Sequence, residues 1–199
     1  EELEGFKQYK VYEKVRIEEC IEKTGKNPLK IRWVDVNKGD EVNPEYRSRL
    51  VAKEIKVDKR LDLFAAMPPL EAKKMLFSLA VTEGIGYKGT NRRKGMKIDF
   101  IDIRKAYFQA AAIRDVYVEL PEEDMEEGMC GKLLKSMYGT RDAAHNWENE
   151  YTEFMEGMGF CRGVASPCVF YNKDKDIRVV VHGDDFTVLG LESDLDWFR

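Results

Sequence analysis

Alternation between hydrophobic and charged residues predicts several short strands along the chain. Residues 31–36 fit one strand, and residues 46–56, in which basic and apolar side chains alternate, fit the strand that returns after a turn at 37–40. Residues 116–120 and 132–138 are two further apolar segments, each closed by a proline or a glycine. The pattern therefore predicts two strand pairs.

Two other segments repeat their apolar residues at helical spacing. Residues 70–83, and a segment that begins after Asp142, each place an apolar stripe along one face of a helix. The stripes consist of Ala72, Met75, Leu76, Leu79 and Ala80 in the first helix and of Trp147, Tyr151, Phe154, Met155 and Met158 in the second. Asp142 is a suitable N-cap, and Gly157 and Gly159 end the second helix. We interpret both stripes as surfaces that pack on the core.

Residues 97–103 predict a buried strand that carries carboxylates. Ile98, Phe100 and Asp102 share one face because side chains alternate along a strand, and Asp99 lies on the other face. An Asp in such a strand needs a partner, because an unpaired buried charge is costly. Periodicity does not choose between Asp99 and Asp102, so both remain candidates at this point.

Residues 178–190 predict a β-hairpin with two adjacent carboxylates at its tip. Apolar, β-branched runs flank Gly183, Asp184 and Asp185, and such a Gly-Asp pair is typical of a tight turn. Ordinary turns carry the same residues and bind nothing. Two adjacent carboxylates nevertheless favour a hard divalent cation such as Mg²⁺, and a third carboxylate from another strand would complete a site for phosphate chemistry.

The order of these elements indicates the fold class. Residues 1–20 are charged without a strong period, so we expect a helix or an irregular lead-in there; residues 25–28 predict a turn and residues 84–95 a loop. A strand pair, a helix, a carboxylate-bearing strand, a second strand pair, a helix and the hairpin follow one another. This order predicts an α+β fold with helices packed on one face of an antiparallel sheet.

Composition excludes several classes of protein. The longest apolar run, at 75–81, is far too short to span a bilayer, and no secretory signal opens the chain, so we expect neither a membrane partner nor secretion. The four cysteines form no C-x-x-C pair and are accompanied by two histidines, which makes a structural zinc site improbable and suits a reducing, intracellular compartment. Because the first residue is Glu, we expect a piece of a longer polypeptide.

The distribution of charge says more than the net charge of −4, which alone does not predict a nucleic-acid binder. Basic residues cluster at 47–60 and again at 88–97, whereas acidic residues gather at 122–127. Each basic cluster can meet a phosphate backbone or a triphosphate, and each can equally be a solvated surface loop. Both readings remain open.

Eight segments, taken in order, resemble the reverse transcriptase domain of copia-type long-terminal-repeat retrotransposons. They are WVDVNKGD, YRSRLVAKE, LFAAMPPLEAKKMLFSLAV, DIRKAYFQA, VYVELP, LLKSMYGTRDAAHNW, GFCRGVASPCVFY and VVVHGDDFTVLG, and they cover nearly the whole chain from about residue 30. The resemblance implies the fingers and palm subdomains of a right-hand polymerase. It implies a lead-in at 1–29, a fingers-like region at 30–95 and a palm at 96–199. Some fingers elements would be interleaved near 115–140, and the thumb and RNase H domain would be absent.

The resemblance also assigns the catalytic residues. The family pattern of an Asp followed four positions later by Ala and an aromatic residue selects Asp102, and the paired-Asp position corresponds to Asp184 and Asp185. These three carboxylates are the implied catalytic residues and the implied ligands of two Mg²⁺ ions, with Mn²⁺ as a substitute.

Five further residues match positions at which the family contacts the nucleotide. Tyr107 occupies the position of a bulky ring beneath the sugar, which excludes a 2′-hydroxyl and so favours deoxynucleotides. Arg49 and Lys53 lie in the stretch that meets the incoming triphosphate, and Gly139 and Arg141 lie in the segment that lines the nucleotide and template.

The sequence departs from the family pattern at four positions. His182 stands where the family usually has Tyr, and Asp142, Ala144 and His145 replace a Gln, a Pro and an Arg. These departures bear on template handling and fidelity more than on the carboxylates. We interpret His182 as an ordinary packed imidazole rather than a catalytic group.

The function predicted in this way is that of an RNA-directed DNA polymerase domain of a retrotransposon polyprotein. It would transfer a nucleotide from dNTP to a primer 3′-hydroxyl on an RNA or DNA template, alongside the integrase, protease and RNase H domains that the family implies, in a cytoplasmic virus-like particle or the nucleus. The chain stops just past the palm hairpin, so inactivity of this piece alone stays open.

Two alternatives remain. One is a catalytically silent remnant that keeps the fold and binds RNA, against which the three intact carboxylates argue. The other is an unrelated Mg²⁺-dependent phosphotransferase or nuclease, which Tyr107 behind Asp102 and the ordered segments disfavour.

Overall fold

The computed structural model describes residues 1–55, 63, 65–82 and 95–199. Nearly all of the loop predicted at 84–95, and several residues of both basic clusters, lie outside these ranges. The chain divides into two compact units. Unit 1 comprises Glu1–Phe64 and Lys105–Trp147, and unit 2 comprises Ala65–Arg104 and Glu148–Arg199.

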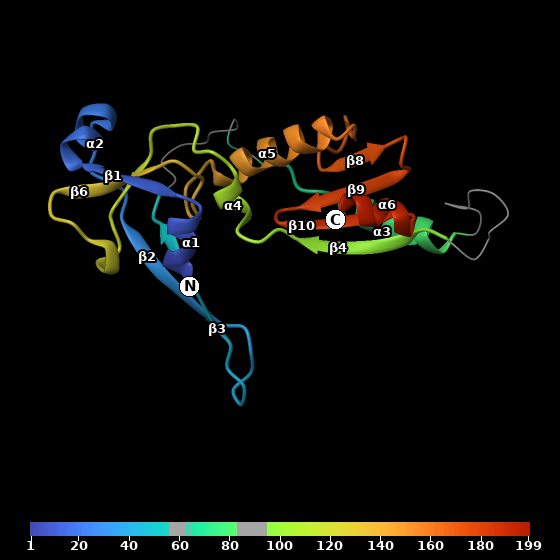
Figure 1. The fold of residues 1–199 in the computed structure, drawn as a ribbon, viewed down its shortest axis with the longest axis horizontal. Coiled ribbons are helices and arrows are strands. Elements are labelled where there is room, and N and C mark those ends of the chain that lie inside the picture. Colours follow the sequence, from blue (N-terminus) through green and yellow to red (C-terminus); the bar gives the residue numbers. More distant parts are fainter. Residues whose placement is uncertain (56–62, 64, 83–94) are drawn as a thin grey trace. The chain divides into compact units, whose positions relative to one another are not determined.

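Unit 1 contains two antiparallel sheets (Figure 1). In the first, β6 (Met129–Leu133) lies between β1 (Tyr12–Arg16) and β5 (Tyr117–Val118). The second is a two-stranded ribbon of β2 (Ile31–Asn37) and β3 (Tyr46–Ala52), which confirms the first predicted strand pair. Along β3, Leu50 and Ala52 are buried, whereas Arg47 and Arg49 lie on the other face of the strand and are exposed or partly exposed.

The helices of unit 1 are short and pack around a core drawn from distant segments. They are α1 (Glu2–Gln8), α2 (Ile17–Thr24), α4 (Ala106–Gln109) and the 3-10 helix η2 (Glu122–Asp124). Phe6, Leu50, Phe108 and Met137 are buried together in this core, so α1, β3, α4 and the segment after β6 stabilise one another.

Two predicted elements of unit 1 differ from the structure. Residues 1–20 contain a strand, β1, which alternation did not reveal because its partly buried side chains, Tyr12 and Val15, are three positions apart and the rest are charged. The strand predicted at 132–138 is instead β6, which ends at Leu133. Beyond Leu133 the amide of Ser136 donates to the Ala110 carbonyl rather than to a neighbouring strand of the sheet. The strand therefore ends although apolar residues continue in the sequence.

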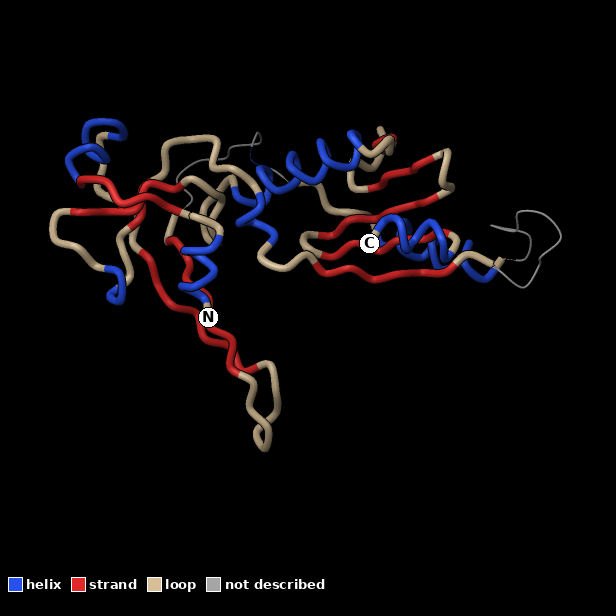
Figure 2. The backbone as a smooth tube through the Cα atoms, viewed as in Figure 1, coloured by secondary structure: helices blue, strands red, loops and turns tan. Residues whose placement is uncertain are grey.

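Unit 2 is built on a five-stranded antiparallel sheet in the order β4-β10-β9-β8-β7. Figure 2 draws its strands in red. The strands are β4 (Lys97–Asp102), β7 (Cys161–Arg162), β8 (Val169–Asn172), β9 (Ile177–His182) and β10 (Asp185–Gly190). The helices are α3 (Leu70–Val81), α6 (Glu192–Phe198) and α5 (Ala143–Gly157), which belongs to this unit from Glu148 onward. The α+β class and the antiparallel sheet are therefore confirmed, as are the two long helices.

The prediction that helices pack on one face of this sheet is wrong. Leu76 of α3 is buried with Val180 and Leu189 on one face. On the opposite face, the Tyr151 ring of α5 contacts Phe186, with 5.7 Å between ring centroids. The cause lies in β9, where consecutive valines at 179–181 are all buried, so both faces of the sheet need a cover.

β4 is an edge strand rather than the buried strand that the pattern predicted. β4 has a neighbour, β10, on one side only, and its Phe100 is 68% exposed. All four cysteines are free thiols, as expected, and three of them are buried. None of the helices in the described ranges combines the length and apolar character that crossing a bilayer requires.

Candidate active site

The tip of the β9–β10 hairpin is a two-residue turn. His182 pairs with Asp185, which leaves Gly183 and Asp184 as the central residues. Gly183 has φ +66° whereas Asp184 has negative φ, as in a type II′ turn, which places Gly at the first central position. The turn therefore projects Asp184 at the tip and starts β10 with Asp185.

Asp102 joins these two carboxylates from the neighbouring strand. The β4–β10 register pairs Asp102 directly with Asp185, and the amide of Ile103 donates to the carbonyl of Asp184 at 2.9 Å. One ligand oxygen from each of the three carboxylates lies within 4.8 Å of the others. Carboxylate oxygens at this spacing suit a hard divalent cation, so the donor set fits the metal that the family implies.

The structure separates Asp99 from this cluster. Asp99 lies on the opposite face of β4, where its Oδ2 accepts a hydrogen bond from Arg199 Nε at 2.7 Å. The choice that periodicity left open is thus resolved in favour of Asp102. His182 also differs from expectation, because its side chain is exposed at the strand end rather than packed.

In unit 1, basic and aromatic side chains contact the ring of Tyr138. The Arg49 guanidinium lies 5.0 Å from the Tyr138 ring centroid, and the Tyr107 ring lies 4.8 Å from it. The structure therefore brings together Arg49 and Tyr107, two predicted nucleotide-binding residues. Tyr138 was missed by sequence reasoning because it resembles the last residue of a strand.

Gly139 lies against the end of β3 in a conformation that favours glycine. Its φ is +88°, and a Cβ built there would come within 2.0 Å of the Ala52 carbonyl oxygen. The amide of Ala52 donates to the Tyr138 carbonyl at 2.8 Å. Gly139 therefore permits a close backbone contact that places the loop after β6 beside exposed Lys53.

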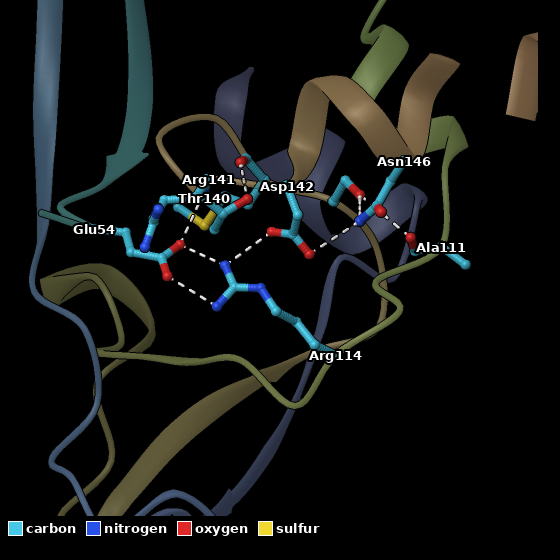
Figure 3. Close-up of polar contacts among 9 residues, drawn as sticks. Glu54, Ala111, Arg114, Thr140, Arg141, Asp142 and Asn146 are labelled. Carbon is cyan, nitrogen blue, oxygen red and sulfur yellow. Dashed lines mark hydrogen bonds and ion pairs between the residues drawn. The ribbon is translucent and has the colours of Figure 1, made fainter. Parts of the chain in front are cut away.

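An ion-pair cluster centred on Arg114 holds the same segments together (Figure 3). Arg114 donates from Nη1 to Glu54 Oε1 at 2.8 Å, from Nη2 to Glu54 Oε2 at 2.5 Å, and from Nη2 to Asp142 Oδ1 at 2.8 Å. The backbone amide of Arg141 donates to Glu54 Oε2 at 2.8 Å. Asn146 Nδ2 donates to Asp142 Oδ2 at 3.2 Å and so fixes the second oxygen of that carboxylate.

The charge of Arg114 governs the ionisation of Asp142. Burial by itself would raise the pKa of this carboxyl, whose residue is 5% exposed, but the hydrogen bond and positive charge of Arg114 outweigh burial and lower the pKa. Asp142 precedes the first residue of α5, and its carbonyl accepts from the Asn146 amide, so the predicted N-cap position is confirmed. Its pairing with Arg114 had no signal in the local sequence.

The N-terminal helix contacts the segment that carries Tyr107. Lys105, which has φ +55° immediately before α4, forms an ion pair with Glu2 of α1, and both side chains are largely buried. The Phe6 ring packs edge-on against Phe108 with 4.9 Å between centroids. Through these two contacts, α1 stabilises the position of α4.

Comparison with known proteins agrees with this arrangement. Residues 9–195 match the family described as reverse transcriptase (RNA-dependent DNA polymerase), and the chain therefore belongs to that family. Its carboxylate-bearing hairpin and the paired strand β4 fall within the matched range.

Similar proteins are plant retrotransposon polyproteins. The chain is 25% identical, over 98% of its length, to a retrovirus-related Pol polyprotein from transposon TNT 1-94 of Nicotiana tabacum, and it covers 14% of that protein. It is 26% identical, over 82% of its length, to the retrovirus-related Pol polyprotein from transposon RE1 of Arabidopsis thaliana, and it covers 11% of that protein. The chain thus spans about one-seventh or less of these relatives.

Proposed function

We propose that this chain is the nucleotidyl-transfer domain of a retrotransposon polyprotein, an RNA-directed DNA polymerase that adds dNTP to a primer 3′-hydroxyl. The observation that carries the proposal is the cluster of Asp102, Asp184 and Asp185, three carboxylates from two paired strands with ligand oxygens within 4.8 Å of one another. Membership of the family makes polymerisation the chemistry to test first.

In this proposal Asp102, Asp184 and Asp185 hold two Mg²⁺ ions, for which Mn²⁺ would be a substitute. When bound, divalent ions supply charge that favours ionisation of the attacking 3′-hydroxyl and offsets the negative charge of the phosphates. The protein makes no covalent bond to the substrate. The carboxylates instead fix the reacting groups in place, and the exposure of Asp102 and Asp185 leaves their oxygens accessible to substrate.

Five residues of unit 1 would bind the nucleotide. Arg49 and Lys53 would neutralise the triphosphate, because both are cationic; Arg49 lies on the face of β3 opposite the core residue Leu50, and Lys53 follows the strand and is exposed. Tyr107, packed against Tyr138, would place a rigid ring beneath the sugar and so exclude a 2′-hydroxyl. The loop from Gly139 to Arg141 would line the base and template.

We further propose that the sheet of unit 2 is the polymerase palm and that the β2–β3 ribbon is part of the fingers. The fingers-like region at 30–95 and the palm at 96–199 remain predictions. The template and primer would be held mainly through their backbones, because a polymerase accepts every sequence. The remaining polyprotein domains would be partners, and the protein would act inside the cell.

The test is extension of a DNA primer on an RNA template, with Mg²⁺ and dNTP, by this chain and by a version continued past Arg199. Asp102→Asn in each form removes one charge from the cluster while leaving the side chain the same size. We expect extension that disappears with Asp102→Asn. Extension that survives this substitution would refute the role of the cluster, and a folded, RNA-binding protein that never extends the primer would be a silent remnant.

A further inference from the structure

Both neighbours of Lys53 are bonded to the loop before α5, and the Arg114 cluster includes one of them, Glu54. Ala52, which precedes Lys53, bonds through its amide to the Tyr138 carbonyl, and Glu54, which follows it, accepts the Arg141 amide. Gly139 lies between these two contacts. The end of β3 and the loop before α5 are thereby held at two points that flank the cation expected to meet the triphosphate.

Arg114 is the group that makes this arrangement possible. Glu54 and Asp142 are both acidic and both largely buried, with side chains 14% and 6% exposed. The two carboxylates would repel one another without the Arg114 cation between them. The planar fork of Arg114 satisfies Glu54 through two nitrogens and still reaches Asp142, which the single ammonium of lysine cannot reproduce.

We propose that Arg114 is a positioning residue for the incoming nucleotide. By joining Glu54 to Asp142 it sets Lys53 and Arg141 at a fixed separation, and this preorganisation lowers the KM for dNTP. The inference rests on the proposed function and extends it to residues that do not themselves touch the substrate.

The cluster should act on binding rather than on the chemical step. Its members belong to unit 1, whereas the three catalytic carboxylates belong to unit 2. Contacts to phosphates that are equal in the ground state and the transition state raise KM when lost and leave kcat unchanged. A shift in KM alone is therefore the signature of this role.

The experiment compares Arg114→Lys with the unmodified chain in primer extension at varied dNTP concentration. We expect the KM for dNTP to rise about tenfold, because the charge-assisted bidentate contact between residue 114 and Glu54 is lost. We expect kcat to stay within about twofold of its value in the unmodified chain. Hydrogen exchange at the Arg141 amide should accelerate, because its acceptor, the Glu54 carboxylate, is no longer bound by two guanidinium nitrogens.

Arg162→Lys is the matched control. Arg162 also forms an ion pair with a buried carboxylate, that of Glu148, but within unit 2 and through one nitrogen, and its side chain is 27% exposed against 35% for Arg114. We expect this control to lower stability to a similar degree and to leave the KM for dNTP unchanged. An equal rise in KM for both variants would show a general effect of instability and overturn the inference.

Other outcomes separate the two proposals. Extension with an unchanged KM in Arg114→Lys, or a loss of kcat alone, would refute the positioning role while the polymerase function stands. If the unmodified chain does not extend primers, the polymerase proposal fails on its own, and binding of a fluorescent dNTP decides the inference. Weaker binding by Arg114→Lys would then support it, and equal or absent binding by both proteins would overturn it.

Discussion

Replacing Gly139 by Ala tests the backbone contact between the loop after β6 and the end of β3. A Cβ at this position would lie 2.0 Å from the Ala52 carbonyl oxygen and 2.5 Å from Val51 Cγ1. The atoms of β3 would have to move, and the hydrogen bond from the Ala52 amide to the Tyr138 carbonyl would be strained or lost. The variant should therefore separate the loop after β6 from the end of β3, next to Lys53.

The cost can be worked out from three contributions. Alanine in the left-handed region costs about 1–2 kcal/mol. Overpacking of a close contact costs about 1–3 kcal/mol, and the lost hydrogen bond contributes about 0.5–1.5 kcal/mol. We therefore expect Gly139→Ala to lower the free energy of unfolding by roughly 3–6 kcal/mol.

Gly25→Ala provides the control, because it shares the backbone strain without the collision. Gly25 ends α2 with φ +67°, and an added Cβ there would meet nothing within 4 Å. It should cost only about 1–2 kcal/mol. Urea unfolding followed by tryptophan fluorescence measures both variants, since Trp33 and Trp147 belong to unit 1. Equal losses of stability, within about 0.5 kcal/mol of each other, would refute the close contact at Gly139.

Two further predictions concern Asp142 and Tyr107. Because pairing with Arg114 lowers the pKa of Asp142 below its ordinary value of 3.8, its contribution to stability is present above about pH 4 and is lost as the pH falls through the folded-state pKa. Asp142→Asn should thus lower the free energy of unfolding by about 3–5 kcal/mol at pH 7 and by much less at pH 3, and a constant difference in urea unfolding would contradict this. Tyr107→Ala should reduce the preference for dNTP over rNTP by about tenfold or more, because the ring beneath the sugar is gone; unchanged kcat/KM ratios would remove Tyr107 from that role.

The carboxylate-bearing hairpin was predictable because its signal is local. A Gly-Asp turn between two β-branched runs specifies a two-residue hairpin, and the register of such a hairpin follows from the turn itself. The identity of the third carboxylate was not local, because Asp99 and Asp102 differ only in which face of β4 they occupy and what lies across from them. Periodicity did not distinguish them; the family pattern selected Asp102, and the pairing of Asp102 with Asp185 agrees with that choice.

The Arg114 cluster illustrates what sequence patterns do not contain. Glu54, Arg114 and Asp142 are separated by 60 and 28 positions, and each looks like a surface charge when read alone. Likewise, β1 carries so many charges that its role beside β6 depends on the partner strand rather than on its own residues. Contacts between segments distant in the sequence decide both features, the ion pairs of Arg114 and the strand pairing of β1.

The docking of α1 has a consequence for where a recombinant domain can be cut. The family match begins at residue 9, but Glu2 and Phe6 lie before it and hold Lys105 and Phe108. A fragment that starts at residue 9 would remove the ion-pair partner of Lys105 and open the aromatic core beside α4 to water. Boundaries drawn from sequence similarity would thus remove a helix on which the packing of unit 1 depends.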